Sequence, residues 1–172
     1  ASTNFKSNNE EAYWRSTKGY INFKSSNQNR AQIIYAGSNG GMLHAINASD
    51  GSEEWAFVPP MIAAQLPLLV NTNYDGAFLL NKKAGGSNAI FGVDGSPVAH
   101  DAYIYGLEKD GSAYQTQKSW RTLLFVPYGR GGAGFSVLDV TIPTLTAGTD
   151  TETGTGPLHM FSIYNDSYNK EV

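Results

Sequence analysis

One glycine-rich segment has the spacing of a phosphate-binding loop. Residues 129–134 read GRGGAG and match the pattern G-x-G-x-x-G of dinucleotide-binding proteins. That pattern binds pyrophosphate because a helix follows it and directs free N–H groups at the ligand. Here residues 135–140 resemble a strand instead. We therefore predict a glycine-rich hairpin loop, in which Arg130, Gly131 and Gly132 are candidates for contact with an anion or a partner.

The histidines are isolated, which disfavours nucleophilic catalysis and transition-metal binding. His44, His100 and His159 have no second histidine at ligand spacing, and no G-x-S-x-G motif is present. His100 and Asp101 are adjacent, so in a strand their side chains would point to opposite faces. The absence of cysteine excludes disulfides, thiolate nucleophiles and zinc–cysteine sites. We predict no catalytic residue, no cofactor and no metal ligand.

A third candidate for chemistry is the acidic stretch over residues 150–156, where oxygen-bearing side chains alternate with glycine. An EF-hand loop needs glycine at its sixth position and a bidentate glutamate at its twelfth. Those positions hold Thr155 and Phe161. The pattern therefore favours a solvated surface loop over a calcium site.

The elements that must position these residues are short strands separated by turns. Apolar residues alternate, glycine-containing turns interrupt them, and Pro59-Pro60 ends the run. Three strands and two turns in this arrangement are typical of a β-propeller blade. The expected strands cover residues 31–36, 42–47 and 53–58.

The remaining segments suggest further blades and long insertions. A second blade is expected over residues 88–143, beginning with a strand at 89–93, and a third blade is expected to begin at 157–172. Insertions would present loops to partners, with Tyr74 and Asp75 as contact candidates in the first of them. The expected connecting segments are a loosely ordered lead-in at 1–30 with one short helix or strand near 11–14, an insertion at 61–87 with a helical turn or two at 61–66, a hairpin at 107–119 and a loop at 141–157.

Four residues are interpreted as structural. Trp55 and Trp120 each occupy a strand that follows a turn, so we expect both to pack between blades. Asp139 stands among apolar residues, where a carboxylate must accept hydrogen bonds from turn N–H groups. Asp94 begins the turn sequence DGSP.

Composition supports an all-β class and excludes some partners. The 172 residues are 41% hydrophobic and only 16% charged, with 19 glycines, as expected for many short strands. The net charge is −3 and the basic residues are scattered, which disfavours nucleic-acid binding. The longest apolar run, residues 61–70, is about half the length of a membrane span. The N-terminus lacks an initiator methionine and a signal sequence, so we expect a piece of a longer protein.

Two resemblances follow from these residues. Residues 35–47 and 51–55 resemble the repeat of quinoprotein-like propellers. A second set of blocks resembles the PilY (PilC) family of type IV pilus tip-associated adhesins, in family order across residues 31–143. These blocks read GGMLHA at 40–45, EWAFVP at 54–59, VDGSP at 93–97, DAY at 101–103, WRTL at 120–123 and GGAGFSVLDVT at 131–141.

The chain departs from the family pattern at two places. The family often has Asn-Asp-Gly where residues 39–41 read NGG, and an aromatic-rich, histidine-containing segment where residues 74–88 stand. The calcium loop of some members lies beyond the residues present. No calcium ligand is therefore transferred to this chain.

The second resemblance implies a partial propeller of about three blades and a non-enzymatic role. The implied protein acts in the bacterial periplasm or at the cell surface, where it supports pilus assembly, twitching motility and attachment through minor pilins or a host or abiotic surface. The alternatives are a quinone-dependent dehydrogenase of the quinoprotein type and a general cell-envelope scaffold. Because an incomplete propeller exposes apolar blade faces, we also expect self-association through its open sides.

Overall fold

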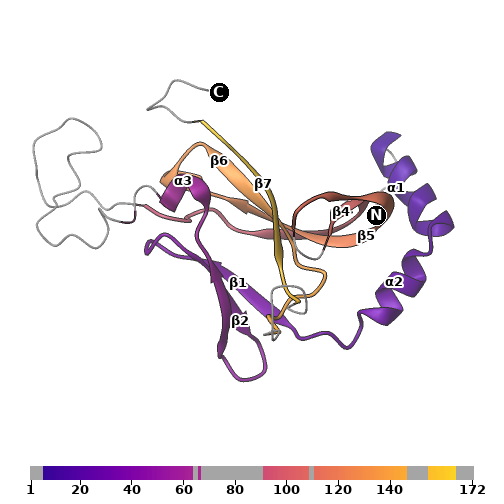
Figure 1. The fold of residues 1–172 in the computed structure, drawn as a ribbon, viewed down its shortest axis with the longest axis horizontal. Coiled ribbons are helices and arrows are strands. Elements are labelled where there is room, and N and C mark those ends of the chain that lie inside the picture. Colours follow the sequence, from indigo (N-terminus) through magenta and orange to yellow (C-terminus); the bar gives the residue numbers. More distant parts are fainter. Residues whose placement is uncertain (1–5, 64–65, 67–90, 109–110, 147–154, 166–172) are drawn as a thin grey trace, which may run out of the picture.

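The structure is a computed structural model that describes residues 6–63, 66, 91–108, 111–146 and 155–165 (Figure 1). Its strands form two antiparallel sheets, called here the first and the second sheet, and helices are few. The all-β prediction is confirmed. The first sheet has the order β1 (Ile33–Gly37), β2 (Leu43–Asn47) and β3 (Glu53–Phe57), and the second has β4 (Val98–Leu107), β5 (Tyr114–Pro127), β6 (Gly134–Asp139) and β7 (Leu158–Tyr164).

The first sheet follows the predicted strands to within two residues at each end, because its turns are encoded locally. In the turn between β2 and β3, the backbone N–H of Ser49 donates to Asn47 Oδ1 at 2.9 Å and that of Ser52 donates to Asp50 Oδ1 at 2.9 Å. The bonds from Ser52 lower the pKa of Asp50. Gly51 adopts φ 75° at the same turn, a conformation that glycine accepts at little cost.

The second sheet differs from the expected blade at both ends. Residues 91–97 are irregular, so the strand predicted at 89–93 is absent from the described residues 91–93, and the sheet begins with β4. β7 pairs antiparallel with β6, as Ser136 lies opposite Ser162. The segment predicted to begin a third blade is therefore the fourth strand of the second sheet. Strand pairing over some 20 residues has no local sequence signal, which explains the error.

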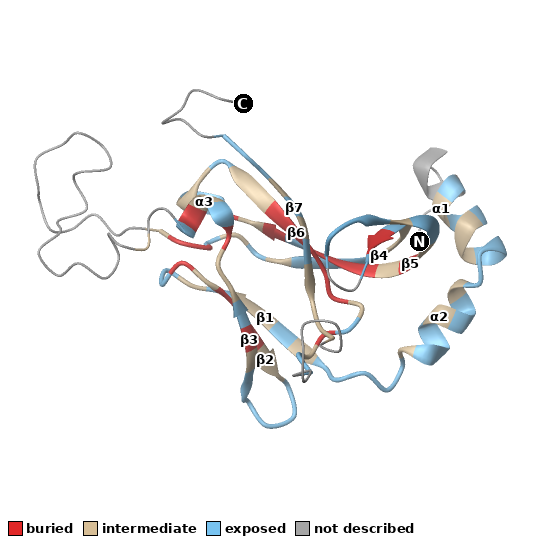
Figure 2. Ribbon diagram, in the orientation of Figure 1, coloured by how far each residue is buried: buried red, intermediate tan, exposed pale blue. Residues whose placement is uncertain are grey.

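The core lies between the two sheets (Figure 2). Leu43, Ala45 and Trp55 of the first sheet pack against alternate residues of the second, and burying each aliphatic side chain contributes about 1.5–3 kcal/mol. Trp55 Nε1 also donates to the carbonyl of Pro143 at 2.7 Å. Trp55 thus lies between the two sheets, in agreement with the prediction that it packs between blades. The second sheet contributes Leu124, Val126 and Leu138, and Val140 follows directly after β6.

Two helices pack at one end of the second sheet, where the sequence predicted a loosely ordered lead-in with at most one short element (Figure 1). They are α1 (Lys6–Thr17) and α2 (Tyr20–Ser26). The Trp120 ring lies 4.7 Å from that of Tyr20, and Trp120 Nε1 donates to the carbonyl of Lys18 at 2.9 Å. Trp120 therefore anchors these helices, and the expectation that it packs between blades is wrong. Tyr20 and Lys18 are about a hundred positions away from Trp120 in the sequence, so no local pattern indicates these contacts.

A short helix, α3 (Pro60–Ala63), follows the first sheet and overlaps the helical turn predicted at residues 61–66. Its Ile62 is fully buried, and the N–H groups of Ile62 and Ala63 both donate to the carbonyl of Pro59 at 2.9 Å. The Pro59-Pro60 pair thus ends the sheet as predicted, because proline cannot continue a ladder, and begins a helix with a fixed φ.

Candidate functional site

Three loops meet at one end of the two sheets, and we call this region the loop junction. It consists of the β1–β2 turn (residues 38–42), the irregular segment 91–97 and the β5–β6 loop (residues 128–133), which contains the 3₁₀ turn η2 (Gly129–Gly131). Val93 N–H donates to the Ser38 carbonyl at 3.0 Å, and Asp94 N–H donates to the Tyr128 carbonyl at 3.1 Å. Segment 91–97 therefore bridges the loops of the two sheets.

Glycines allow this approach of backbones. A Cβ atom on Gly92 would lie 2.6 Å from both Gly41 N and the Ser38 carbonyl oxygen, closer than real side chains come. A Cβ on Gly131 would collide with the Gly92 carbonyl, and one on Gly132 with the Met61 side chain. The GRGGAG motif is thus a hairpin loop, as predicted, and its glycines serve backbone packing. No helix follows it that could bind a phosphate.

Arg130 is the charged group of the loop junction that sequence reasoning selected. Its guanidinium carbon lies 4.2 Å from the centre of the Phe91 ring, a cation–π geometry, and the residue is exposed. Among the described residues no carboxylate forms an ion pair with it. The Arg130 guanidinium therefore packs against the Phe91 ring, and its N–H donors are accessible to solvent. Tyr74 and Asp75, the other predicted contact residues, lie outside the described residues.

A polar pocket of about 440 Å³ opens beside the loop junction. Residues 35–39 form one wall and residues 93–97 form the other. Its side chains include Asn39, Asp94 and Ser96, and Asp94 is exposed while its backbone N–H holds the junction together. This mixture of donors and acceptors suits contact with a polar peptide or another loop.

The histidines are engaged in contacts that hold strands and helices together. His44 Nδ1 lies 2.6 Å from Glu53 Oε2, and its Nε2 lies 3.1 Å from Ser38 Oγ, which links three segments of the first sheet. His100 Nε2 lies 3.5 Å from Glu11 Oε1 of α1.

His159 is the histidine whose contacts come nearest to a catalytic arrangement. Its Nε2 lies 2.9 Å from Ser162 Oγ, which in turn lies 2.7 Å from Ser136 Oγ. In the part of the chain that the structure describes, no carboxylate contacts His159, so no Ser-His-Asp triad forms.

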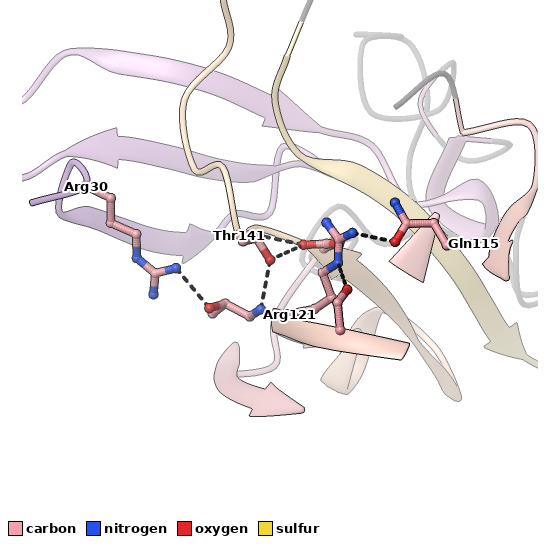
Figure 3. A network of polar contacts seen from close by, with 7 residues as sticks. Arg30, Gln115, Arg121 and Thr141 are labelled. Carbon is pink, nitrogen blue, oxygen red and sulfur yellow. Dashed lines mark hydrogen bonds and ion pairs between the residues drawn. The ribbon is translucent and has the colours of Figure 1, made fainter. Parts of the chain in front are cut away.

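The buried Asp139 carboxylate accepts hydrogen bonds from the turn that follows β6, as expected for a carboxylate among apolar residues. The N–H and the hydroxyl of Thr141 both donate to Asp139 Oδ1, at 2.9 and 2.6 Å. Arg121 Nη1 lies 3.6 Å from Asp139 Oδ2, an atom without a hydrogen bond. Figure 3 shows Arg121 placed between Thr141 and Gln115, whose Oε1 accepts a bond from Arg121 Nη2 at 2.7 Å. Asp139 thus closes the end of β6.

A polar network that sequence reasoning missed joins the helices to the second sheet. Asp101 Oδ1 accepts the Thr122 hydroxyl at 2.6 Å, and Asp101 Oδ2 accepts the Tyr20 hydroxyl at 2.8 Å. Arg30 Nη1 donates to Thr122 Oγ1 at 2.9 Å. The bonded residues are more than 20 positions apart in the sequence, so their spacing gives no local signal. The block DAY at 101–103, one of the blocks that resemble the PilY family, is the sequence feature that lies in this network.

The described residues contain no group of three or more His, Asp or Glu side chains arranged to hold a metal ion. None of the described helices has the length and apolar character that crossing a membrane requires. Most of the acidic loop at 150–156 lies outside the described residues.

Comparison with known proteins points to one family. The profile of the PilY1 beta-propeller domain matches residues 12–151. Type IV pilus biogenesis factor PilY1 of Pseudomonas aeruginosa (strain UCBPP-PA14) is 36% identical over 124 residues, which are 72% of this chain and 9% of that protein. The PilY1 homolog of Xylella fastidiosa (strain Temecula1) is 31% identical over 133 residues, 77% of this chain and 9% of that protein. The chain therefore spans about a tenth of the length of these relatives.

A solved structure is also similar. The crystal structure of the Pseudomonas aeruginosa PilY1 C-terminal domain aligns with 87% of this chain and 21% of that chain, at 27% sequence identity and a TM-score of 0.48.

Proposed function

This chain belongs to the PilY1 β-propeller family, and we propose that it is part of a non-enzymatic type IV pilus biogenesis protein. The observation that carries the proposal is the family match over residues 12–151, together with relatives that are named type IV pilus biogenesis factors. In this proposal the protein acts in the periplasm or at the cell surface. There it supports pilus assembly, twitching motility and attachment.

The proposed mechanism is that of a rigid platform that presents loops. The buried faces of both sheets hold the loop junction in place, and glycines lock its three loops together by backbone contacts. Arg130 and the pocket beside Asn39 and Asp94 then offer polar groups to a pilus component or a surface. Sites on loops held by a scaffold are common in binding proteins. The described histidines and Asp139 are engaged in structural bonds, which supports a role without catalysis.

A second surface supports the proposal that this unit is built into a larger propeller. We call it the outer face of the second sheet, and it consists of Val98, Phe125, Phe135, Phe161 and Ile163. Val98, Phe125 and Phe161 are 59%, 36% and 39% exposed, and the Phe135 ring lies 6.4 Å from those of both Phe125 and Phe161. A sheet that is apolar on both faces is normally covered on both. In the longer protein, another blade would cover this face.

Complementation in a piliated bacterium tests the function. The gene that encodes this chain would be deleted and restored with the wild-type sequence, with Arg130→Gln or with Lys24→Gln as a surface-charge control. We expect the deletion to abolish surface pili and twitching zones and wild-type to restore both. Arg130→Gln should restore fewer pili or a smaller zone than Lys24→Gln. Normal piliation and motility in the deletion strain would refute the pilus role, whereas full restoration by Arg130→Gln would refute only the loop contact.

A further inference from the structure

A second pocket lies at the opposite end of β1 from the loop junction, where the linker from α2 passes the second sheet. We call it the Arg30 pocket. It has a volume of about 370 Å³, within the range of small-ligand sites. Arg30 is the single charged residue among the residues that line it. The other wall residues that matter here are Gln32, Ile33, Tyr35, Thr122, Val140 and Pro143.

The orientation of Arg30 is fixed by a chain of hydrogen bonds. Thr122 gives its hydroxyl hydrogen to Asp101 Oδ1 at 2.6 Å, so the Thr122 oxygen is left to accept from Arg30 Nη1 at 2.9 Å. The dashed line from Arg30 in Figure 3 marks the second of these bonds. Thr122 is 5% exposed, so water has little access to its hydroxyl. One of the five N–H donors of the guanidinium forms this bond, and the other four donate to no described residue.

Arg30 forms no direct ion pair with a carboxylate in the described part of the chain. The nearest acid in the hydrogen-bond chain is Asp101, which is separated from Arg30 by the Thr122 hydroxyl and also accepts the Tyr20 hydroxyl at 2.8 Å. No described carboxylate lies within ion-pair distance of Arg30, whereas Arg15 pairs with Glu11 at 2.6 Å and Arg121 lies 3.6 Å from Asp139. Arg30 is exposed, and its guanidinium can form a bidentate pair with an anion that enters the pocket.

The rest of the wall favours an anion that carries an apolar group. Burial raises the pKa of Tyr35 to about 12, against the charge of Arg30, which acts to lower it. Tyr35 thus stays neutral and adds no negative charge to the pocket at physiological pH. Ile33, Val140 and Pro143 supply an apolar wall next to the guanidinium. A carboxylate attached to a small apolar group matches both features, since carboxylates bind guanidinium in a bidentate manner.

We propose that the Arg30 pocket binds the C-terminal carboxylate of a protein partner whose last residue is apolar. Arg30 donates to the carboxylate, Thr122 holds Arg30 in position, and the apolar wall contacts the adjacent side chain. This inference does not depend on the pilus role, because it follows from the charge and shape of the pocket.

The test uses acetyl-leucine as the probe and acetyl-leucine amide as its uncharged counterpart, with ¹⁵N-labelled protein. We expect the acid to shift the amide signals of Gln32 and Thr122 in a saturable way, and the amide to bind at least about tenfold more weakly. This comparison uses the unmodified chain, so it does not depend on the folding of a variant. Equal shifts from acid and amide would overturn the proposal, as would shifts spread over Lys24 and Arg130.

Variants then identify the responsible cation. Arg30→Gln should lower the affinity for acetyl-leucine about tenfold or more, Arg30→Lys should retain part of it, and Lys24→Gln should leave it unchanged. Thermal unfolding of each variant verifies that the fold is kept. The last measurement repeats the titration with inorganic phosphate in place of acetyl-leucine. Binding of phosphate at the same signals more tightly than the carboxylate would overturn the choice of ligand.

Discussion

The two faces of the second sheet are both apolar, but they are covered to different extents. On the outer face, Leu123 and Val137 are buried while Phe125 is partly exposed. Leu124 and Val126 on the inner face are 1% and 0% exposed beneath the first sheet, whereas Phe125 between them is 36% exposed on the outer face. Successive residues of a strand alternate between faces, so one strand samples both environments. The first sheet covers the inner face, whereas the outer face keeps exposed apolar side chains that a further blade could cover.

The largest expected effect comes from adjacent substitutions on the two faces. Leu124→Ala should lower the free energy of unfolding by about 3 kcal/mol, because it leaves a cavity in a close-packed core. Phe125→Ala should cost less than about 1 kcal/mol at low protein concentration, because its ring is already hydrated in part. Urea denaturation measures both. Equal losses would contradict the distinction between the faces.

The inner interface should also respond to pH through Tyr35, which packs against the core. Its pKa is raised from 10.0 to about 12, so the folded state holds its proton more tightly than the unfolded state. The associated stability is fully present below pH 10 and is lost as pH rises through about 12. Two pKa units correspond to at most roughly 2.7 kcal/mol, and water around the partly exposed Tyr35 ring reduces the contribution below that value.

Chemical denaturation at pH 9, 10 and 11 tests this dependence. Tyr35→Phe should reduce the downward slope that the wild-type chain shows as pH increases, and the part that remains includes Tyr20, whose pKa is also raised by burial and by its bond to Asp101. A slope that is unchanged in Tyr35→Phe would show that other groups control alkaline stability.

The contact between the loops of the two sheets depends on Gly92. Gly92→Ala should destabilise the chain by about 2 kcal/mol, because the added carbon would force the backbones of two loops apart. Gly40→Ala is a matched control in the same region, since a Cβ there meets Ser38 Oγ at 3.4 Å. Thermal unfolding should show a clearly lower midpoint for Gly92→Ala than for Gly40→Ala. Similar midpoints would mean that the loop junction is loosely packed.

The smallest effect concerns the outer face itself. If the first sheet covers one face and nothing covers the other, the isolated chain should self-associate, and Phe125→Ser with Phe161→Ser should reduce this association without lowering stability by more than about 1 kcal/mol. Light scattering across a concentration series measures the mass. A wild-type chain that stays monomeric at high concentration would contradict the role of this face as a docking surface.

Several features were predictable because their causes are local. Residues 48–51 form a turn through Asn47 and Asp50, and the GRGGAG motif forms a hairpin loop because a strand pattern follows it. Asp139 also needed only a nearby donor, which Thr141 supplies two residues later. In each case the partners lie within a few positions, so periodicity and turn chemistry sufficed.

The errors and omissions all involve distant partners. Trp120 was expected between blades, but its ring meets Tyr20 and its indole N–H bonds to Lys18, about a hundred positions away. The Arg30–Thr122–Asp101 chain escaped notice for the same reason. The predicted contact residues Arg130, Gly131 and Gly132 do gather at the loop junction, although their role in binding a partner remains a prediction.

By itself, the sequence determined the all-β class, the strands of the first sheet and the family, because these depend on local alternation, turn residues and ordered motif blocks. Only the tertiary structure decided that β7 completes the second sheet, that two helices dock on Trp120 and that Arg30 faces a pocket without a carboxylate. Those outcomes depend on which distant residues meet. Such meetings are set by the packing of the whole chain rather than by any short stretch of it.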